Sequence, residues 1–313
     1  MPRQQRFGST EFELAAGLPA GSLDARTRSL LEETPLFFLP LNENAQQKIR
    51  AEVQAEIDRG FTVVGQHRAG VWRDAWQDHL DEFVRSGHAL EALNPRFVGG
   101  TSILRWQGAY VEGVTSRFEL AFLEIFRDWL FRTYLSDIGH LYEFGSGSAF
   151  NVAAYARLFP AVGITALDWA PAAVALADLL HSKHGMKIAG QRFDFFVPDQ
   201  ALDLSVDGGV LTMCALEQIG DRFGPFVDYL LDKRPKRVVH VEPILELYDP
   251  ASPHDAAAVR YHSQRKYLSG LLPSLQELAR QGKIQLRKVH RLHFGSRFHE
   301  CFCLIVWEPG PRQ

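Results

Sequence analysis

The chain has 313 residues, 46% hydrophobic and 23% charged, which allows a sizeable buried core and argues against long disorder. Its net charge of −3 at pH 7 and pI of about 6.5 offer no concentrated basic surface for nucleic acid or an anionic membrane. The chain lacks a signal-peptide core, a run of roughly twenty apolar residues and any Cys-x-x-Cys pair. We therefore expect a cytoplasmic protein without nucleic-acid or membrane partners.

The N-terminal part precedes the strongest motif and divides into two sections. Residues 1–35 mix polar, Gly and Pro residues and predict an irregular arm. Helical spacing of apolar residues then predicts helices, over residues 45–59, 72–86 and 117–135. The aromatic stripe of the last of these helices indicates core packing. We expect residues 36–139 to form a helical accessory region that caps the site.

From residue 140 onward, strand and helix patterns alternate, which predicts a parallel α/β sheet over residues 140–313. Short apolar runs predict strands, at 141–144, 163–168, 189–194, 209–213 and 237–242. Amphipathic stretches predict helices, at 151–159, 171–184, 222–233 and 261–281. The last two apolar runs, 284–293 and 301–307, predict a terminal antiparallel hairpin.

The segment YEFGSGSAF, residues 142–150, is the most informative of the chain. An apolar run reaches Glu143, two glycines bracket Ser146, and an amphipathic helix follows. Glycine permits positive φ and lets a ligand approach closely, and a helix start offers free N–H groups and a positive dipole end. The pattern is typical of a nucleotide-cofactor site, although an ordinary strand-to-helix turn uses glycines in the same way.

The residues around this loop favour S-adenosylmethionine over a dinucleotide. A dinucleotide site needs a third glycine beside the pyrophosphate, and Phe150 occupies that position. Glu143 would repel a phosphate but suits a cationic sulfonium and an ammonium group. Asp168 ends the next predicted strand, 21 residues beyond Gly147, where an acid is placed to bind both ribose hydroxyls. The alternative is that Asp168 is an N-terminal acid of the helix that Pro171 opens.

Four segments, in order, resemble class I S-adenosylmethionine-dependent methyltransferases of the small-molecule type. They are EFGSG at 143–147, LDW at 167–169, FDF at 193–195 and VLTMCALEQI at 210–219. The resemblance implies an α/β fold with a Rossmann-like, mostly parallel seven-stranded sheet, and methyl transfer to an oxygen or nitrogen atom of a small molecule. The chain departs from the family pattern at the third loop glycine, here Ser148-Ala149, and at the acid before strand four, shifted to Asp207.

The resemblance also implies where the cofactor lies, at the carboxyl ends of the strands. The cofactor-binding candidates are Glu143, Gly145, Ser146, Gly147, Asn151, Asp168, Trp169, Asp194, Phe195, Thr212 and Met213. Asp194 and Phe195 match the segment with which the family binds adenine. We expect no metal, because no cluster has convincing ligand spacing.

Glu242 and His262 are the candidate catalytic residues, because both follow strand five on the ligand-binding edge. The acceptor-binding candidates are Arg105, Tyr110, Glu217, Tyr261 and Arg265, with Trp72 as a further capping residue. An ion pair for Glu242 and a solvated helix face for His262 are the alternatives. His299 and Glu300, before the last strand, form another candidate pair.

Two other functions stay open at this point. An NAD(P)-dependent oxidoreductase uses a related fold, although Phe150 and Glu143 disfavour it. A non-catalytic module could retain the cofactor fold, although the acidic and glycine positions are intact. The sequence identifies neither the methyl acceptor nor the oligomeric state.

Overall fold

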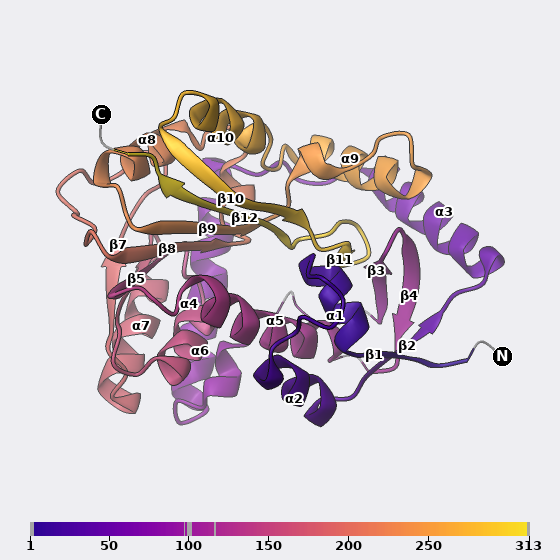
Figure 1. Cartoon of the computed structure of the whole chain (residues 1–313), viewed down its shortest axis with the longest axis horizontal. Coiled ribbons are helices and arrows are strands. Elements are labelled where there is room, and N and C mark those ends of the chain that lie inside the picture. The colour runs from indigo at the N-terminus through magenta and orange to yellow at the C-terminus, as the bar shows by residue number, and fades with distance from the viewer. Residues whose placement is uncertain (1–2, 97, 99–101, 116, 312–313) are drawn as a thin grey trace.

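The computed structural model describes residues 3–96, 98, 102–115 and 117–311, which form two β-sheets surrounded by helices (Figure 1). The larger sheet has the strand order β10-β12-β9-β8-β5-β6-β7. Its parallel strands are β5 (His140–Phe144), β6 (Gly163–Asp168), β7 (Ile188–Arg192), β8 (Gly208–Met213) and β9 (Arg237–Glu242). The antiparallel pair β10 (Ile284–Arg291) and β12 (Cys303–Pro309) completes it beside β9. The expected Rossmann-like sheet with a terminal hairpin is confirmed.

Helices cover both faces of this sheet (Figure 1). On one face lie α8 (Gly224–Lys233) and α10 (Leu271–Arg280), which share a hydrophobic core with the sheet. On the other lie α5 (Phe118–Tyr134), α6 (Phe150–Leu158) and α7 (Pro171–His184), within a second core. From β5 the chain builds outward to β6 and β7 on one side and to β8 and β9 on the other. Such a switch leaves a crevice at the strands' carboxyl ends.

The single helix expected over 261–281 is wrong, because two helices occupy this region. The first, α9, spans Pro253–Arg265, and Lys266 ends it in a left-handed conformation with φ of 50°. The Lys266 N–H donates to the carbonyl oxygens of His262 and Ser263, a helix-terminating pattern that apolar spacing does not reveal. Gly270, also left-handed, precedes α10.

The smaller sheet is antiparallel and belongs mainly to the N-terminal region. Its order is β1 (Gln5–Phe7), β2 (Leu36–Pro40), β4 (Ala109–Gly113), β3 (Ile103–Trp106) and β11 (Phe294–Gly295). The expected helices of residues 36–139 are present as α3 (Glu43–Arg59), α4 (Ala69–Arg85) and α5, but strand β2 before α3 and strands β3 and β4 before α5 were not predicted. They are short, and β11 reaches β3 from the far end of the chain.

Contrary to expectation, the described part of residues 1–35, from residue 3 onward, is not an irregular arm. They form β1, α1 (Ser9–Ala16) and α2 (Ala25–Glu33), and Phe7 and Phe12 are buried. Phe7 packs edge-on against Phe122 of α5 at 5.4 Å between ring centroids, and Phe294 lies 4.0 Å from Phe122. The aromatic stripe of α5 is therefore core packing, as expected, and this core joins both ends of the chain to the larger sheet.

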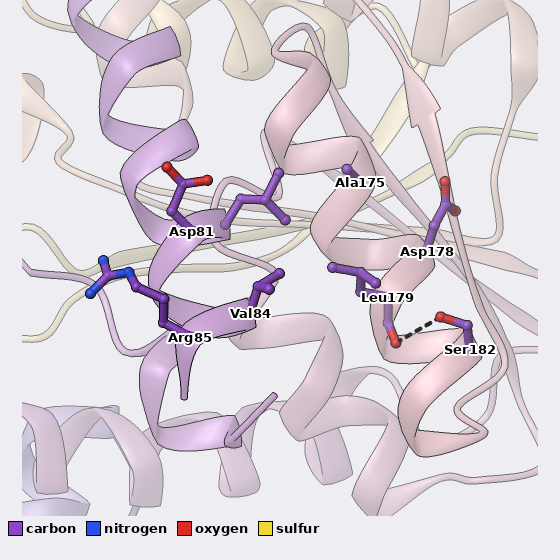
Figure 2. Close-up of a pocket in the computed structure, with 8 residues that line it drawn as sticks. Asp81, Val84, Arg85, Ala175, Asp178, Leu179 and Ser182 are labelled. Carbon is purple, nitrogen blue, oxygen red and sulfur yellow. Dashed lines mark hydrogen bonds between the residues drawn. The ribbon is translucent and has the colours of Figure 1, made fainter. Parts of the chain in front are cut away.

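Helix α4 lies along α7, and a hollow of about 820 Å³ opens between them on the surface (Figure 2). Side chains of two helices line it, among them Asp81 and Arg85 of α4 and Asp178 and Leu179 of α7. None of the residues that line this hollow lies at the end of a strand, and none is a candidate site residue. The hollow is therefore separate from the candidate active site. Over the ranges described, none of the helices combines the length and apolar character needed to cross a membrane.

Candidate active site

A cavity of about 690 Å³ lies at the carboxyl ends of β5, β6, β7 and β8. Loops after these strands line one part of it, with Gly145, Asp168 and Asp194 among their residues. Helix α4 and the 3-10 helix η1 (Gln66–Arg68) add Trp72, Trp76 and Arg68. Helix α9 and the loop before β12 complete the wall with Tyr261, Arg265, His299 and Cys301. Residues of the N-terminal region and of the strand-end loops therefore line the same cavity.

Both glycines of the loop are needed for its shape. Gly145 and Gly147 have φ of 79° and 50°, in the left-handed region. A Cβ on Gly145 would overlap the side chain of Ala215, and one on Gly147 would lie 2.7 Å from the Trp76 indole. The loop is consequently held close to both the β8 side and the α4 side of the cavity.

Ala149, at the position of the family's third loop glycine, has a backbone conformation that glycine adopts most readily. Ala149 has φ of 61° and directly precedes α6. An L-residue pays about 1–2 kcal/mol for this conformation, so the surrounding structure must impose it. Ala149 therefore departs from the family pattern by carrying a side chain, and its backbone is left-handed.

Asp168 braces the glycine loop and faces the cavity. Its Oδ2 accepts from the Gly147 N–H at 3.0 Å, and its Oδ1 accepts from the Ala170 N–H at 2.9 Å. Burial raises the pKa of Asp168 to about 6. Each carboxylate oxygen has a further lone pair, so the two backbone bonds leave acceptor capacity toward the cavity.

Glu143 lies behind the loop, outside the lining of the cavity. Its Oε1 accepts from Asn151 Nδ2 at 2.8 Å, and Asn151 Oδ1 accepts from Arg127 Nη1 at 3.2 Å. Arg127 also donates to the carbonyl of Phe150 at 2.9 Å and lies 3.4 Å over its ring. Burial raises the pKa of Glu143 to about 8. Arg127, which the sequence did not single out, ties α5 to the start of α6.

The structure brings most of the other cofactor-binding candidates to the same cavity. Ser146, Asn151, Trp169, Asp194, Phe195 and Met213 line the cavity together with the glycines and Asp168. Thr212 does not, because its side chain is fully buried and its Oγ1 lies 2.9 Å from Nδ1 of His240.

Neither catalytic candidate lines the cavity. Glu242 is fully buried, and its Oε1 accepts from the N–H groups of Ala215 at 3.1 Å and Leu216 at 3.2 Å. Burial raises the pKa of Glu242 to about 7. This carboxyl group therefore holds the loop after β8, next to the cavity-lining Glu217.

His262 is buried behind His299, and His299 faces the cavity. Nε2 of His262 lies 3.0 Å from Nδ1 of His299, and Nε2 of His299 lies 3.4 Å from Sγ of Cys301. Burial lowers the pKa of His262 to about 3 and lowers that of His299 well below its ordinary value. Both imidazoles are neutral at pH 7, so each ring offers one donor and one acceptor nitrogen.

Among the acceptor candidates, Glu217, Tyr261, Arg265 and Trp72 line the cavity, whereas Arg105 and Tyr110 do not. Arg105 is fully buried and lies 3.4 Å from Glu300 and 3.3 Å from Asp255. Arg291 pairs with the same two acids, at 2.5 Å and 2.6 Å. The fully buried Tyr110 ring lies 5.8 Å from the Arg105 guanidinium. These residues join β3 to α9 and the terminal hairpin, as a charge-balanced structural cluster.

No family model matches the sequence, and no curated protein matches it either. Among solved structures, the [4+2]-cyclase SpnF is similar at 12% identity and a TM-score of 0.54, covering 81% of this chain and 99% of SpnF. The N,N-8-amino-8-demethyl-D-riboflavin dimethyltransferase RosA from Streptomyces davawensis is similar at 15% identity and a TM-score of 0.41, covering 61% of this chain. This chain spans 57% of the length of RosA.

A third solved structure is human N-acetylserotonin methyltransferase in complex with SAM, at 16% identity and a TM-score of 0.41. That match covers 76% of this chain and 67% of the human chain. At such identities the comparisons bear on the fold alone. The chain therefore has a Rossmann-like fold with a mostly parallel seven-stranded sheet, and it is similar in fold to SpnF.

Proposed function

We propose that this protein is an S-adenosylmethionine-dependent methyltransferase that transfers a methyl group to an oxygen or nitrogen atom of a small molecule. The observation that carries the proposal is the left-handed loop of Gly145 and Gly147, hydrogen-bonded to Asp168 at the floor of one cavity. A loop of this shape lets a cofactor approach the backbone closely. The acids around it suit a cationic cofactor better than a pyrophosphate.

Buried atoms around the loop fit this cofactor. Within the described residues, Oε2 of Glu143 and Oγ of Ser146 are buried without a hydrogen-bond partner. Such atoms cost free energy unless a ligand or water satisfies them, and an ammonium group in the cavity is a suitable donor for Ser146 Oγ, because Ser146 lines the cavity whereas Glu143 lies behind the loop. We assign Asp168 to the ribose hydroxyls, and Asp194 with Phe195 to the adenine. The bound cofactor supplies an electrophilic methyl group on a sulfonium.

The protein's own contribution to such a transfer is alignment and, for a hydroxyl acceptor, a proton acceptor. We propose that His299 faces the acceptor and that His262 acts through it, by fixing the ring through their hydrogen bond. Glu242 acts in a similar indirect way, by holding the loop that carries Glu217. His262 and Glu242 are then positioning residues.

We also propose that residues 36–139 cap the site. Arg68, Trp72 and Trp76 line the cavity opposite the strand ends, which supports the idea. A fragment that begins near residue 137 should lose cofactor binding, because the cavity would be open to water. A folded fragment with normal methyl transfer would contradict the cap.

The match to SpnF favours one competing possibility. SpnF is described as a [4+2]-cyclase, and a fold does not fix the chemistry performed on it. The cavity would then position a ligand for a reaction other than methyl transfer.

Two measurements separate these functions. Calorimetry should show binding of S-adenosylmethionine and none of NAD⁺ or NADP⁺. A screen of small aromatic and aliphatic hydroxyl and amino compounds with methyl-labelled S-adenosylmethionine should then transfer label to at least one class. Cofactor binding without transfer across the screen would favour the alternative chemistry, and NAD⁺ binding would reject the proposal.

A further inference from the structure

We propose that the methyl acceptor is a planar aromatic compound bearing a carboxylate, which binds between Arg68 and Arg265. This inference rests on the proposed methyltransferase function, because it assigns the part of the cavity beyond the cofactor loop.

The two arginines reach the cavity from connected segments. Arg265 is the last residue of α9, and its carbonyl oxygen accepts from the N–H of Val64 at 2.8 Å. Four residues after Val64, Arg68 ends the 3-10 helix η1. Both side chains line the same cavity. The backbone bond therefore holds together the two segments that carry these cavity-lining arginines.

Neither arginine forms an ion pair within the described part of the chain. Nη1 of Arg68 and Nε of Arg265 are buried without a hydrogen-bond partner among those residues. Arg105 and Arg291, by contrast, share two carboxylates. An unsatisfied buried donor is costly, and a carboxylate accepts two parallel bonds from a guanidinium. A ligand carboxylate would supply what the protein lacks here.

The titratable groups nearest the arginines compensate this positive charge only in part at neutral pH, although Glu119 of α5 also lines the cavity. Glu217 faces the same region, and burial, with Glu242 nearby, raises its pKa to about 8. Burial also raises the pKa of Tyr261 and of Tyr267, and it keeps His299 neutral. The thiol of Cys214 faces the cavity with a raised pKa, beside Cys301. Asp168 and Asp194 belong to the strand-end loops at β6 and β7.

Aromatic side chains make the walls around the arginines suited to a flat ring. The rings of Trp72 and Trp76 stack at 5.7 Å, and those of Tyr261 and Tyr267 meet edge-on at 5.6 Å. The Arg265 guanidinium lies 4.9 Å from the Tyr267 ring, and its Nη2 donates to the Tyr267 hydroxyl at 3.0 Å. The Arg265 guanidinium already occupies the cation-binding face of the Tyr267 ring, so a cationic acceptor could not bind there. The site therefore selects against an ammonium group.

The test uses three probes that share a phenol ring and differ in charge: 4-hydroxybenzoate, 4-hydroxybenzamide and 4-hydroxybenzylamine. Calorimetry is performed on the full chain saturated with S-adenosylhomocysteine. We expect the benzoate to bind about tenfold or more tightly than the amide, and the benzylamine most weakly, since a charge-assisted pair contributes about 1.5–3 kcal/mol. Equal affinities, or a preference for the benzylamine, would overturn the inference without any variant.

Variants then assign the preference to residues. R68Q and R265Q should each lower benzoate affinity to that of the amide and leave S-adenosylhomocysteine affinity within about twofold. R260Q is the matched control, because Arg260 lies on the same helix but is exposed and paired with Asp58. Unchanged benzoate binding in both arginine variants would overturn the assignment. Loss of S-adenosylhomocysteine binding in R68Q would show that Arg68 holds the cofactor's own carboxylate, which also overturns it.

The experiment separates this inference from the function on which it rests. If the unmodified protein binds neither S-adenosylmethionine nor S-adenosylhomocysteine, the methyltransferase proposal is wrong. If it binds the cofactor and shows no carboxylate preference, only the acceptor class is wrong.

Discussion

The two ends of the cavity, which we have proposed to bind the cofactor and the methyl acceptor, are built in different ways. The cofactor end, formed by Gly145, Gly147 and Asp168, is shaped by backbone, with left-handed residues and a carboxylate that accepts main-chain N–H groups. The acceptor end, formed by Arg68, Glu217, Arg265 and His299, is shaped by side chains from segments far apart in sequence. Substitutions should therefore act through steric fit at the cofactor end and through charge and proton transfer at the acceptor end.

Gly145→Ala should have the largest effect, at the cofactor end. The new Cβ meets Ala215 and the backbone is left-handed. Overpacking costs about 1–3 kcal/mol and the conformation about 1–2 kcal/mol. We expect cofactor affinity to fall about 100-fold, measured by calorimetry with S-adenosylmethionine. Binding close to normal would show that the loop yields and that its shape is not what selects the cofactor.

His299→Gln should have the largest effect at the acceptor end. Removing a proton acceptor that faces a hydroxyl acceptor lowers kcat/KM by about 10²-fold or more, while cofactor affinity should stay the same. His262→Ala should lower kcat and change the pH profile through His299, because the rings are hydrogen-bonded. His290, a half-buried histidine whose Nε2 lies 2.8 Å from the carbonyl oxygen of Ala15, is the control for substitution of a histidine that does not line the cavity. Normal turnover in His299→Gln would leave alignment alone as the source of catalysis.

Asp168→Ala should lower cofactor affinity less than Gly145→Ala does. It removes the bonds to Gly147 and Ala170 and those assigned to the ribose. Charge-assisted bonds contribute about 1.5–3 kcal/mol, so affinity should fall about tenfold or more. Asp168→Asn keeps part of the hydrogen-bond acceptor capacity, so its cofactor affinity should lie between that of the unmodified protein and that of Asp168→Ala. Unchanged affinity in Asp168→Ala would reject the ribose assignment.

The two ends of the cavity also differ in how well the sequence predicted them. The cofactor end comes from contiguous segments, so apolar runs located β6 and β9 at their observed bounds and spacing placed Asp168. Glu242 was expected to face the ligand, but its direction depends on the N–H groups after β8, which spacing does not reveal. Arg105 was also expected at the acceptor, yet β11 pairs with β3 and its side chain is buried among acids.

The acceptor end was less predictable because it depends on long-range folding. His299 reaches the cavity from the loop between β11 and β12, and Arg68 reaches it because Val64 bonds to α9. His299 was a candidate because of its position before the last strand, whereas no local pattern marks Arg68. The helices of residues 1–35 were missed for a different reason: they are short, and burial of Phe7 and Phe12 against α5 stabilises them more than their own periodicity does.

The pH dependence of acceptor binding tests the charge at the acceptor end. Glu217 has a raised pKa of about 8, so it is mainly neutral at pH 6.5 and mainly ionised well above pH 8. Its negative charge opposes a carboxylate beside Arg68 and Arg265, so 4-hydroxybenzoate affinity should fall as pH rises from 6.5 to 8.5. Calorimetry across this range should show the fall in the unmodified protein and a flatter profile in Glu217→Gln. An equal fall of affinity with pH in the unmodified protein and in Glu217→Gln would show that a group other than Glu217 causes the pH dependence.

Ala149→Gly should have the smallest effect on cofactor affinity, and it tests whether the alanine strains the glycine loop. Glycine relieves a left-handed alanine of about 1–2 kcal/mol but adds about 0.4–1 kcal/mol of unfolded-state entropy. The free energy of unfolding should therefore rise by about 1 kcal/mol or less, measured by urea titration. Cofactor affinity should stay within about twofold, because the loop already has the conformation that a third glycine would adopt. A large gain in affinity would instead show that Ala149 distorts the loop, and that the missing glycine weakens the cofactor site.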